Sequence, residues 1–229
     1  MAIRESVIHL VSIPWNRDWT GKQEINPMKT EIYELNGKPI GIPIAESYKD
    51  CIKLIKSDRY RLSGKKESAF SVILHGLRPF KSSLLFWLRL CQYKGWLYPL
   101  CKILCAYSKR QAQVDIPTST KIGYGFYIGH EMCIVINNGT IIGNNVNISH
   151  FVNIGTNHKT PAIIGNNVYI GPHVCLVEDV KIGNNVTIGA GAVVTKDVPE
   201  NVTIAGVPAK VLNYNNPGRY ITNPWPLEL

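Results

Sequence analysis

A strict six-residue period organises the chain from Ile116 to Pro199. Thirteen successive units each begin with an aliphatic residue, and the phase breaks only twice, by two residues after Ile128 and by four after Ile154. A period of six matches neither the 3.6-residue stripe of an α-helix nor a coiled-coil heptad. It fits a parallel β-helix whose coils have three short flat sides, with one unit on each side. The aliphatic heads, which we expect to stack inside, are Ile116, Ile122, Ile128, Ile136, Ile142, Ile148, Ile154, Ile164, Ile170, Leu176, Ile182, Ile188 and Val194.

Small and amide side chains recur at the predicted corners of this coil. Glycine follows eight of the thirteen heads, and Asn-Asn pairs follow the glycines at 143, 165 and 183. Both residue types tolerate left-handed backbone angles, which sharp corners require. Thirteen sides make about four coils, a prism roughly 20 Å tall at the usual strand spacing. A purely structural solenoid is the alternative, and the two phase breaks with their neighbouring residues argue against it.

The positive charge lies in the N-terminal half of the chain. Of the 229 residues, 1–112 hold 19 Lys and Arg against 9 Asp and Glu, whereas 113–229 hold 6 against 7. No apolar run approaches the roughly 18 residues of a membrane span, and the N-terminus lacks a signal-peptide cleavage site. Cys133 and Cys175 fall two coils apart, beyond the reach of a disulfide. We therefore expect a reduced, cytoplasmic protein.

The composition divides the chain into four segments. Residues 1–45 form an N-terminal arm with a hairpin, because Asn36-Gly37 favours a tight turn between two short strands. Residues 46–112 are predicted to be helical, 113–212 form the β-helix, and 213–229 form an extended tail rich in Pro and Asn. The expected helices cover Ser47–Ser57, Ser82–Tyr93 and Trp96–Tyr107.

The helical segment combines basic and aromatic residues. Between Cys51 and Arg110 there are 13 Lys and Arg and only 2 Asp and Glu. Such helices suit an anionic membrane surface, which would place the protein at the inner face of the membrane. An equally weighted alternative is a packing or oligomerisation domain whose apolar face meets the prism. Nucleic-acid binding is less favoured, because no recognised motif accompanies the charge.

His130 lies beside the first phase break, where inserted residues leave the coil as a loop. Three units per coil place Asp115 on the side directly below. Attack of a hydroxyl on a thioester needs a base that works near pH 7, and histidine suits this best. A carboxylate bonded to the imidazole would fix its tautomer and stabilise its protonated form. Alternatively, Asp115 caps the first coil and His130 is a surface loop residue.

The stretches Val114-Asp115-Ile116, Ile128-Gly129-His130, Ile141-Ile142-Gly143 and Asn147-Ile148-Ser149 resemble the hexapeptide-repeat acyltransferases, specifically their serine acetyltransferase branch. The resemblance covers about residues 85–212. It implies a left-handed coil, acetyl-CoA as co-substrate, and Asp115 with His130 as the catalytic pair. His158, beside the second insertion, matches a further histidine of that branch. The resemblance also implies a homotrimer with each site between two prisms, or a dimer of such trimers.

Two departures from that branch bear on the acceptor. Asn157 replaces the arginine that helps to hold the carboxylate of the amino acid, and the helical segment is shorter and more basic. Both features resemble acetyltransferases of cell-surface polysaccharide synthesis, so a sugar hydroxyl is our first expectation. Serine O-acetylation is the alternative, and a non-catalytic membrane-surface scaffold is the alternative of another class.

Further histidines and the C-terminal coils complete the expected site. His150 occupies the position of His130 one coil higher, as a support for that base or as a rival base, and His173 is expected at the surface. These histidines include no pair at the spacing that zinc ligands of this architecture require, so we expect no metal site. Resemblance assigns the acetyl-CoA groove to the C-terminal coils, where lysines would meet phosphates. Its residues are Gly189, Ala190, Lys196, Ala205, Gly206 and Lys210.

Overall fold

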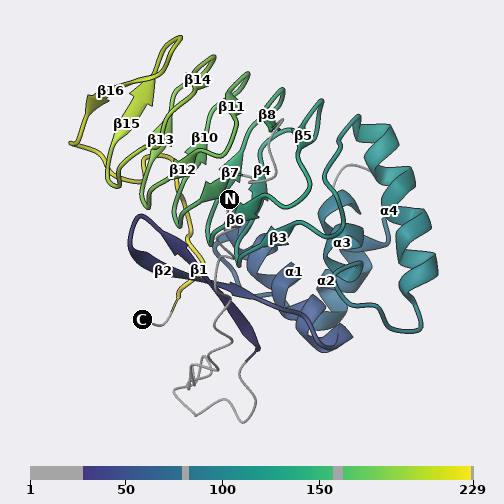
Figure 1. Ribbon diagram of the computed structural model, residues 1–229. Helices are drawn as coiled ribbons and strands as arrows, with labels where there is room; N and C mark the ends of the chain where they lie inside the picture. Colours follow the sequence, from purple (N-terminus) through teal and green to yellow (C-terminus); the bar gives the residue numbers. More distant parts are fainter. Residues whose placement is uncertain (1–27, 79–82, 157–161, 228–229) are drawn as a thin grey trace, which may run out of the picture.

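The computed structural model describes residues 28–78, 83–156 and 162–227, and it contains a three-sided prism of parallel coils (Figure 1). Three sheets form its sides, each named here after its first strand. The β3 face comprises β3 (Lys121–Ile122), β6 (Ile141–Ile142), β9 (Ile163–Ile164) and β12 (Lys181–Ile182). The β4 face comprises β4 (Tyr127–Ile128), β7 (Asn147–Ile148), β10 (Tyr169–Ile170), β13 (Thr187–Ile188), β15 (Thr203–Ala205) and the antiparallel β16 (Lys210–Asn213). The β5 face comprises β5 (Val135–Ile136), β8 (Asn153–Gly155), β11 (Cys175–Val177) and β14 (Val193–Val194).

The aliphatic heads stack in register inside the prism. Ile122 pairs with Ile142, and Ile142 with Ile164 and then Ile182, so one ladder climbs the whole β3 face. These four side chains are at most 1% exposed. Complete burial of each such side chain contributes roughly 1.5–3 kcal/mol, and the ladder therefore fixes the register of the coils. The predicted period and architecture are confirmed.

Asparagines hold the corner between the β3 and β4 faces. Asn145, Asn167, Asn185 and Asn201 all adopt positive φ. The amide of Asn167 donates to Asn185 Oδ1 at 3.0 Å, and that of Asn185 donates to Asn201 Oδ1 at 2.9 Å. Gly143 is required beside them, because a Cβ there would lie 2.4 Å from the carbonyl oxygen of Gly165. The corner is thus built from residues that accept its backbone angles and also bond to one another.

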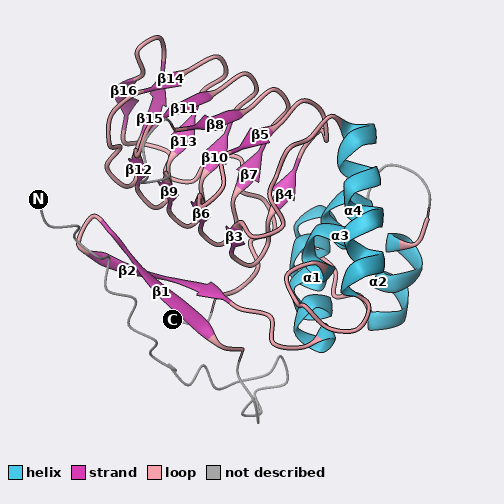
Figure 2. Ribbon diagram, turned by 45° about the vertical axis from the view of Figure 1, so that its right-hand side comes forward, coloured by secondary structure: helices cyan, strands magenta, loops and turns pink. Residues whose placement is uncertain are grey.

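A hairpin of β1 (Thr30–Leu35) and β2 (Lys38–Pro43) turns at Asn36-Gly37 and lies against the β3 face (Figure 2). The buried side chains of Ile40 and Ile42 contact Ile141. The amide of Asn144 also donates to Gly41 O at 3.1 Å. The predicted hairpin is therefore present, and it covers one side of the prism.

Four helices close the first coil of the prism. They are α1 (Tyr48–Ser63), α2 (Ala69–Gly76), α3 (Ser83–Leu90) and α4 (Tyr98–Ala112). Ser47 caps α1, which runs six residues beyond its expected end at Ser57, and α2 was not predicted at all. Pro99 sits in the first turn of α4, where the missing N–H costs nothing. Helices and prism share one apolar core, so the domain boundaries stay predictions.

Two arginines of the basic segment, Arg61 and Arg89, face inward and join the helices to the prism. Arg89, which is 0% exposed, forms two bonds to the Asp58 carboxylate at 2.8 and 2.9 Å and donates to the carbonyl oxygens of Ile122 and Gly123. Burial pulls the pKa of Asp58 above its ordinary value, while Arg89 and the Phe126 N–H oppose that shift. Among the basic residues between Cys51 and Arg110 that were expected to suit a membrane surface, Arg89 is therefore excluded, because no solvent reaches it.

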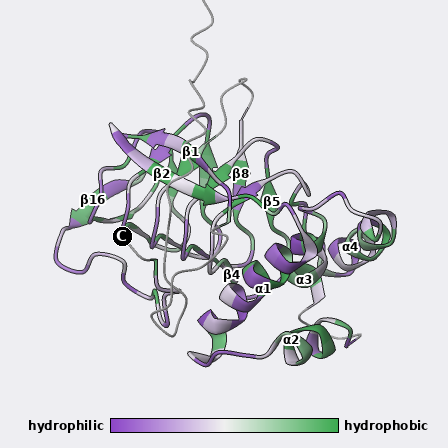
Figure 3. Ribbon diagram, turned by 90° about the horizontal axis from the view of Figure 1, so that it is seen from below, coloured by the Kyte–Doolittle hydropathy of each residue, from purple (hydrophilic) through white to green (hydrophobic). Residues whose placement is uncertain are grey.

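The outer side of the helical layer remains apolar in places (Figure 3). One exposed apolar face begins just before α4 and continues along it. Its residues are Trp96, Leu100, Ile103 and Tyr107. Within the part of the chain that the structure describes, no helix is long and apolar enough to cross a membrane. A membrane-surface role stays a prediction that rests on this outer face alone.

The C-terminal tail runs back along the prism from the last coils to the first. The N–H of Gly218 donates to Asn185 O, and the amide of Asn147 donates to Tyr220 O. At the far end, the backbone N–H and C=O of the buried Trp225 both bond to the side chain of Asn145, at 2.7 and 3.0 Å. The expected extended tail is thus docked as a strap over the asparagine corner.

The Asp58–Arg89 pair generates a stability prediction. D58N should lower the free energy of unfolding by about 3–5 kcal/mol, because it leaves a buried guanidinium without its counter-charge. The double variant D58L/R89M should cost less than D58N alone, because it removes both charges. Urea denaturation measures both. The control is E200Q, which breaks the exposed Lys38–Glu200 pair and should leave the midpoint nearly unchanged. Equal losses in D58N and E200Q would contradict this account.

Candidate active site

The sheet register brings His130, His150 and part of the predicted donor segment onto one edge of the prism. One isoleucine from each coil is aligned along the β4 face: Ile128, Ile148, Ile170, Ile188 and Ile204. The residues two positions further on therefore also align, at the corner where the chain turns toward the β5 face. We call this corner the β4–β5 edge; from the first coil upward it carries His130, His150, Pro172, Ala190 and Gly206.

Aromatic rings cluster at the lower part of the β4–β5 edge. The ring centroids of His130 and His150 lie 5.4 Å apart, and those of His150 and His173 lie 5.8 Å apart, both edge to face. Phe151 stacks on His173 at 4.6 Å. Nδ1 of His150 is buried without a hydrogen-bond partner, whereas the side chain of His130 is exposed. His130 is thus more accessible than His150, whose ring packs against it.

Asp115 lies below the same corner but bonds elsewhere. Its backbone bridges to Val135 of the β5 face, one coil above. Its carboxylate, 72% exposed, pairs with Nζ of Lys109 at 3.0 Å. No hydrogen bond joins it to His130, contrary to expectation. Lys109 lies in the last turn of α4, which places its full positive charge beside the carboxylate.

The second predicted histidine, His158, lies outside the described residues, as does Asn157. Among the residues that are described, no group of three or more His, Cys, Asp or Glu could hold a metal ion. All six cysteines are free.

Small residues form the upper part of the β4–β5 edge. A Cβ at Gly189 would lie 2.9 Å from the Cβ of Ala205, so glycine is required where these coils approach. Gly206 adopts a φ of +99°, in the left-handed region that favours glycine. Ala190 and Gly206 are exposed, so an extended ligand can lie close to the backbone here. Lys196 and Lys210 are also exposed.

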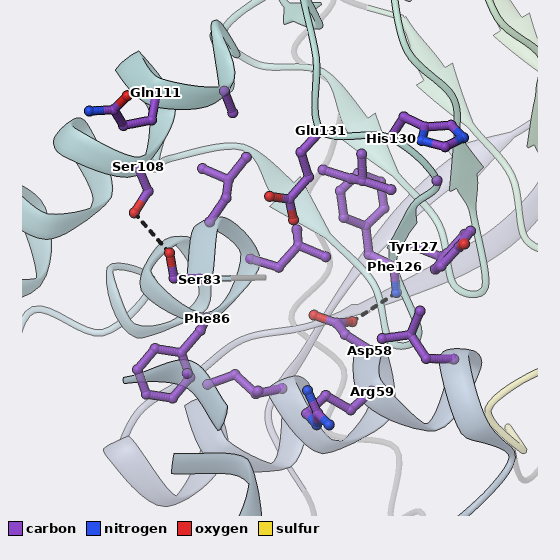
Figure 4. A pocket seen from close by; sticks show the side chains of 18 of the residues that line it. Asp58, Arg59, Ser83, Phe86, Ser108, Gln111, Phe126, Tyr127, His130 and Glu131 are labelled. Carbon is purple, nitrogen blue, oxygen red and sulfur yellow. Dashed lines mark hydrogen bonds between the residues drawn. The ribbon is translucent and has the colours of Figure 1, made fainter. Parts of the chain in front are cut away.

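A cavity of about 710 Å³ lies between the first coil and the four helices (Figure 4). Phe126, Ile128, Leu84 and Phe86 contribute to its apolar lining. The carboxylate of Glu131 points into it, whereas the ring of His130 lies at its rim beside the strands. Burial raises the pKa of Glu131 to about 7. The sequence prediction missed Glu131, although it is one of the residues inserted at the first phase break.

Comparison with known proteins agrees with this architecture. Residues 161–196 match the family model "Bacterial transferase hexapeptide (six repeats)". The prism therefore has the hexapeptide-repeat fold. The chain is 34% identical over 143 residues to a serine acetyltransferase from Buchnera aphidicola, which covers 60% of this chain and 52% of that protein. It is 40% identical over 109 residues to a galactoside O-acetyltransferase from Escherichia coli, covering 42% of this chain and 54% of the relative.

A solved relative supports the same class. The serine acetyltransferase of Vibrio cholerae superposes with a TM-score of 0.57 at 26% identity, covering 71% of this chain and 66% of that one. The chain spans about half the length of these two curated relatives. The similarity concerns acetyltransferases in every case described here.

The raised pKa of Glu131 generates a pH-dependent prediction. The folded protein holds the proton between pH 4.5 and about 7, so the free energy of unfolding should fall as pH rises through that range. E131Q removes the charge and should stabilise the protein by about 3 kcal/mol at pH 8 but not at pH 4. Thermal unfolding at both pH values measures this. Glu34, exposed on the hairpin, is the matched control, and E34Q should change neither value. Destabilisation of E131Q at pH 8 would contradict the assignment.

Proposed function

We propose that this protein is an acetyl-CoA-dependent O-acetyltransferase. The observation that carries the proposal is the β4–β5 edge, which aligns an exposed imidazole with a run of small residues along one side of the prism. The similarity to acetyltransferases supports it, as does the hexapeptide-repeat match over residues 161–196. Acetyl-CoA is the donor that this class of relative implies, and no metal takes part in the proposed reaction.

His130 acts as the general base in this proposal. It takes the proton of the acceptor hydroxyl as that oxygen attacks the thioester carbonyl carbon, and a tetrahedral intermediate forms. The C–S bond then breaks, and the imidazolium returns its proton to the departing thiolate, so that an ester and free CoA result. Asp115 would orient His130 once it leaves Lys109, and the partly buried His150 would pack behind the base. His158 is proposed as a further residue of the site.

The donor would lie along the upper part of the β4–β5 edge. Gly189, Ala190, Ala205 and Gly206 leave room for an extended pantetheine arm beside the backbone. The exposed Lys196 and Lys210 would pair with its phosphates. We further propose a trimer in which a neighbouring prism forms the second wall of this groove, because closed cyclic assembly buries flat faces that one prism leaves open.

The identity of the acceptor is proposed from the relatives. Serine acetyltransferases predominate among them, which supports L-serine as acceptor more strongly than the sugar of a surface polysaccharide. The galactoside O-acetyltransferase keeps a sugar hydroxyl as the second candidate.

Substitution of His130 tests the base directly. H130A should lower the turnover number at least about 100-fold, because general base catalysis contributes that much or more. The affinity for acetyl-CoA should stay within about twofold, because the donor contacts lie higher on the edge. Thiol release gives the rate, and calorimetry gives the donor affinity. Turnover equal to that of the wild type would remove His130 from the mechanism.

Asp115 and Lys109 can be tested as a pair. D115N should lower turnover less than H130A, because the base remains. K109M should preserve or raise turnover at pH 7, because it frees the carboxylate to bond to His130. The pH–rate profile of each variant provides the measurement, with K121M, whose lysine pairs with Glu31 on the hairpin, as a matched control. A K109M loss as large as that of H130A would show that Lys109 itself acts in the reaction.

A further inference from the structure

The cavity beneath the first coil contains charged side chains, and all but one of these are already neutralised. Asp58 is held by Arg89, and Nε of Arg59 lies 2.7 Å from the carboxylate of Glu67. Glu131 differs: no hydrogen bond or ion pair joins its carboxylate to any other residue in the described ranges. Glu131 is half-buried and its carboxylate points into the cavity, so a ligand that enters the cavity can supply the hydrogen-bond partner that the described residues do not.

The remaining lining indicates what the rest of that ligand is like. Buried hydrophobic residues from α2, α3 and the first coil line most of the cavity, namely Val72, Leu84, Phe86 and Phe126. Met132 adds a flexible side chain at the rim. A volume of about 710 Å³ lies within the range of roughly 300–1,000 Å³ typical of sites for drug-sized ligands. Free serine would leave most of this apolar space unfilled.

The charge balance disfavours an anionic group at this place. Arg59 is the single Lys or Arg among the described lining residues and is already paired with Glu67, and the free group, Glu131, is itself acidic. A carboxylate or phosphate of a ligand would therefore meet Glu131 without a counter-charge. A hydroxyl or an amine can instead donate a hydrogen bond to Glu131, which favours an uncharged or cationic molecule.

We propose that this cavity is the acceptor site, and that the acceptor is an alcohol with a large apolar substituent that donates a hydrogen bond to Glu131. The inference rests on the proposed acetyl transfer, and it selects the second acceptor candidate, a sugar hydroxyl, over the L-serine that most of the relatives support. Glu131 and His130 both line the cavity, but their side chains diverge (Figure 4), so the acceptor must extend past Glu131 to bring a hydroxyl to the imidazole. An alkyl glycoside meets these requirements: its apolar chain fills the space between the helices and its sugar hydroxyls meet Glu131 and His130.

The experiment compares two neutral acceptors that differ only in their apolar part, methyl and octyl β-galactoside, with L-serine as a third. Thiol release from acetyl-CoA should give a kcat/KM for the octyl compound at least about tenfold above that for the methyl compound and for serine. E131Q should raise KM for the octyl acceptor about tenfold while leaving KM for acetyl-CoA unchanged. E34Q, on the hairpin, should leave both values unchanged.

A second variant tests the cavity independently of Glu131. Ser83 lines it, and S83F places a phenyl ring in the apolar space, whereas S119F adds the same ring at an exposed turn outside the lining. S83F should abolish the preference for the octyl compound, and S119F should retain it. Equal use of the octyl and methyl compounds by the wild type, or a kcat/KM for serine above that for the octyl compound, would overturn the proposal.

Binding without chemistry separates this proposal from the proposed function. Calorimetry with octyl β-galactoside and no donor should show binding that S83F removes and S119F retains. Such binding without any thiol release would support the cavity as a ligand site and overturn acetyl transfer. Thiol release with an acceptor that S83F and E131Q leave unaffected would support acetyl transfer and overturn the assignment of the cavity.

Discussion

The in-register stacking of buried aliphatic residues determines everything else in this structure. Each coil repeats the backbone of the coil below, because Ile128, Ile148, Ile170, Ile188 and Ile204 occupy equivalent places in one sheet. Residues at equal offsets from these heads must then share an edge. The alignment of His130 with Ala190 and Gly206 is thus a consequence of core packing. A slip of one residue in any coil would expose a head and break the edge.

Attachment of the helices adds the second element of the site. The Asp58–Arg89 pair, which is removed from solvent, binds α1 and α3 to the carbonyl oxygens of Ile122 and Gly123 in the first coil. Arg61 adds bonds to Gly125 O and to Asn147 Oδ1, both at 2.7 Å. Burial lowers the pKa of Arg61 to about 10, so it remains charged at neutral pH. These contacts hold the helices against the prism and so shape the cavity into which Glu131 points.

The sequence predicted the features that depend on local repetition. The period of six identified the coils and their heads, Asn36-Gly37 identified the hairpin turn, and the phase break identified the loop of His130. Features that depend on distant partners were missed. Asp58 and Arg89 are 31 residues apart, and no sequence pattern relates them. Lys109 forms its ion pair with Asp115 only because α4 ends beside the first coil. α2 has only eight residues, too few for a helical period to stand out in the sequence. Glu131 had a signal, its place in the insertion, but its burial depends on the helices.

A structure of the protein crystallised with CoA would test the central claim most directly, namely that donor and base share the β4–β5 edge. The claim predicts a pantetheine arm that lies along Gly206, Ala205, Ala190 and Gly189, with its thiol within about 4 Å of a His130 imidazole, from the same protomer or its neighbour. A CoA molecule ordered on the β3 face, or a thiol remote from every His130, would contradict it.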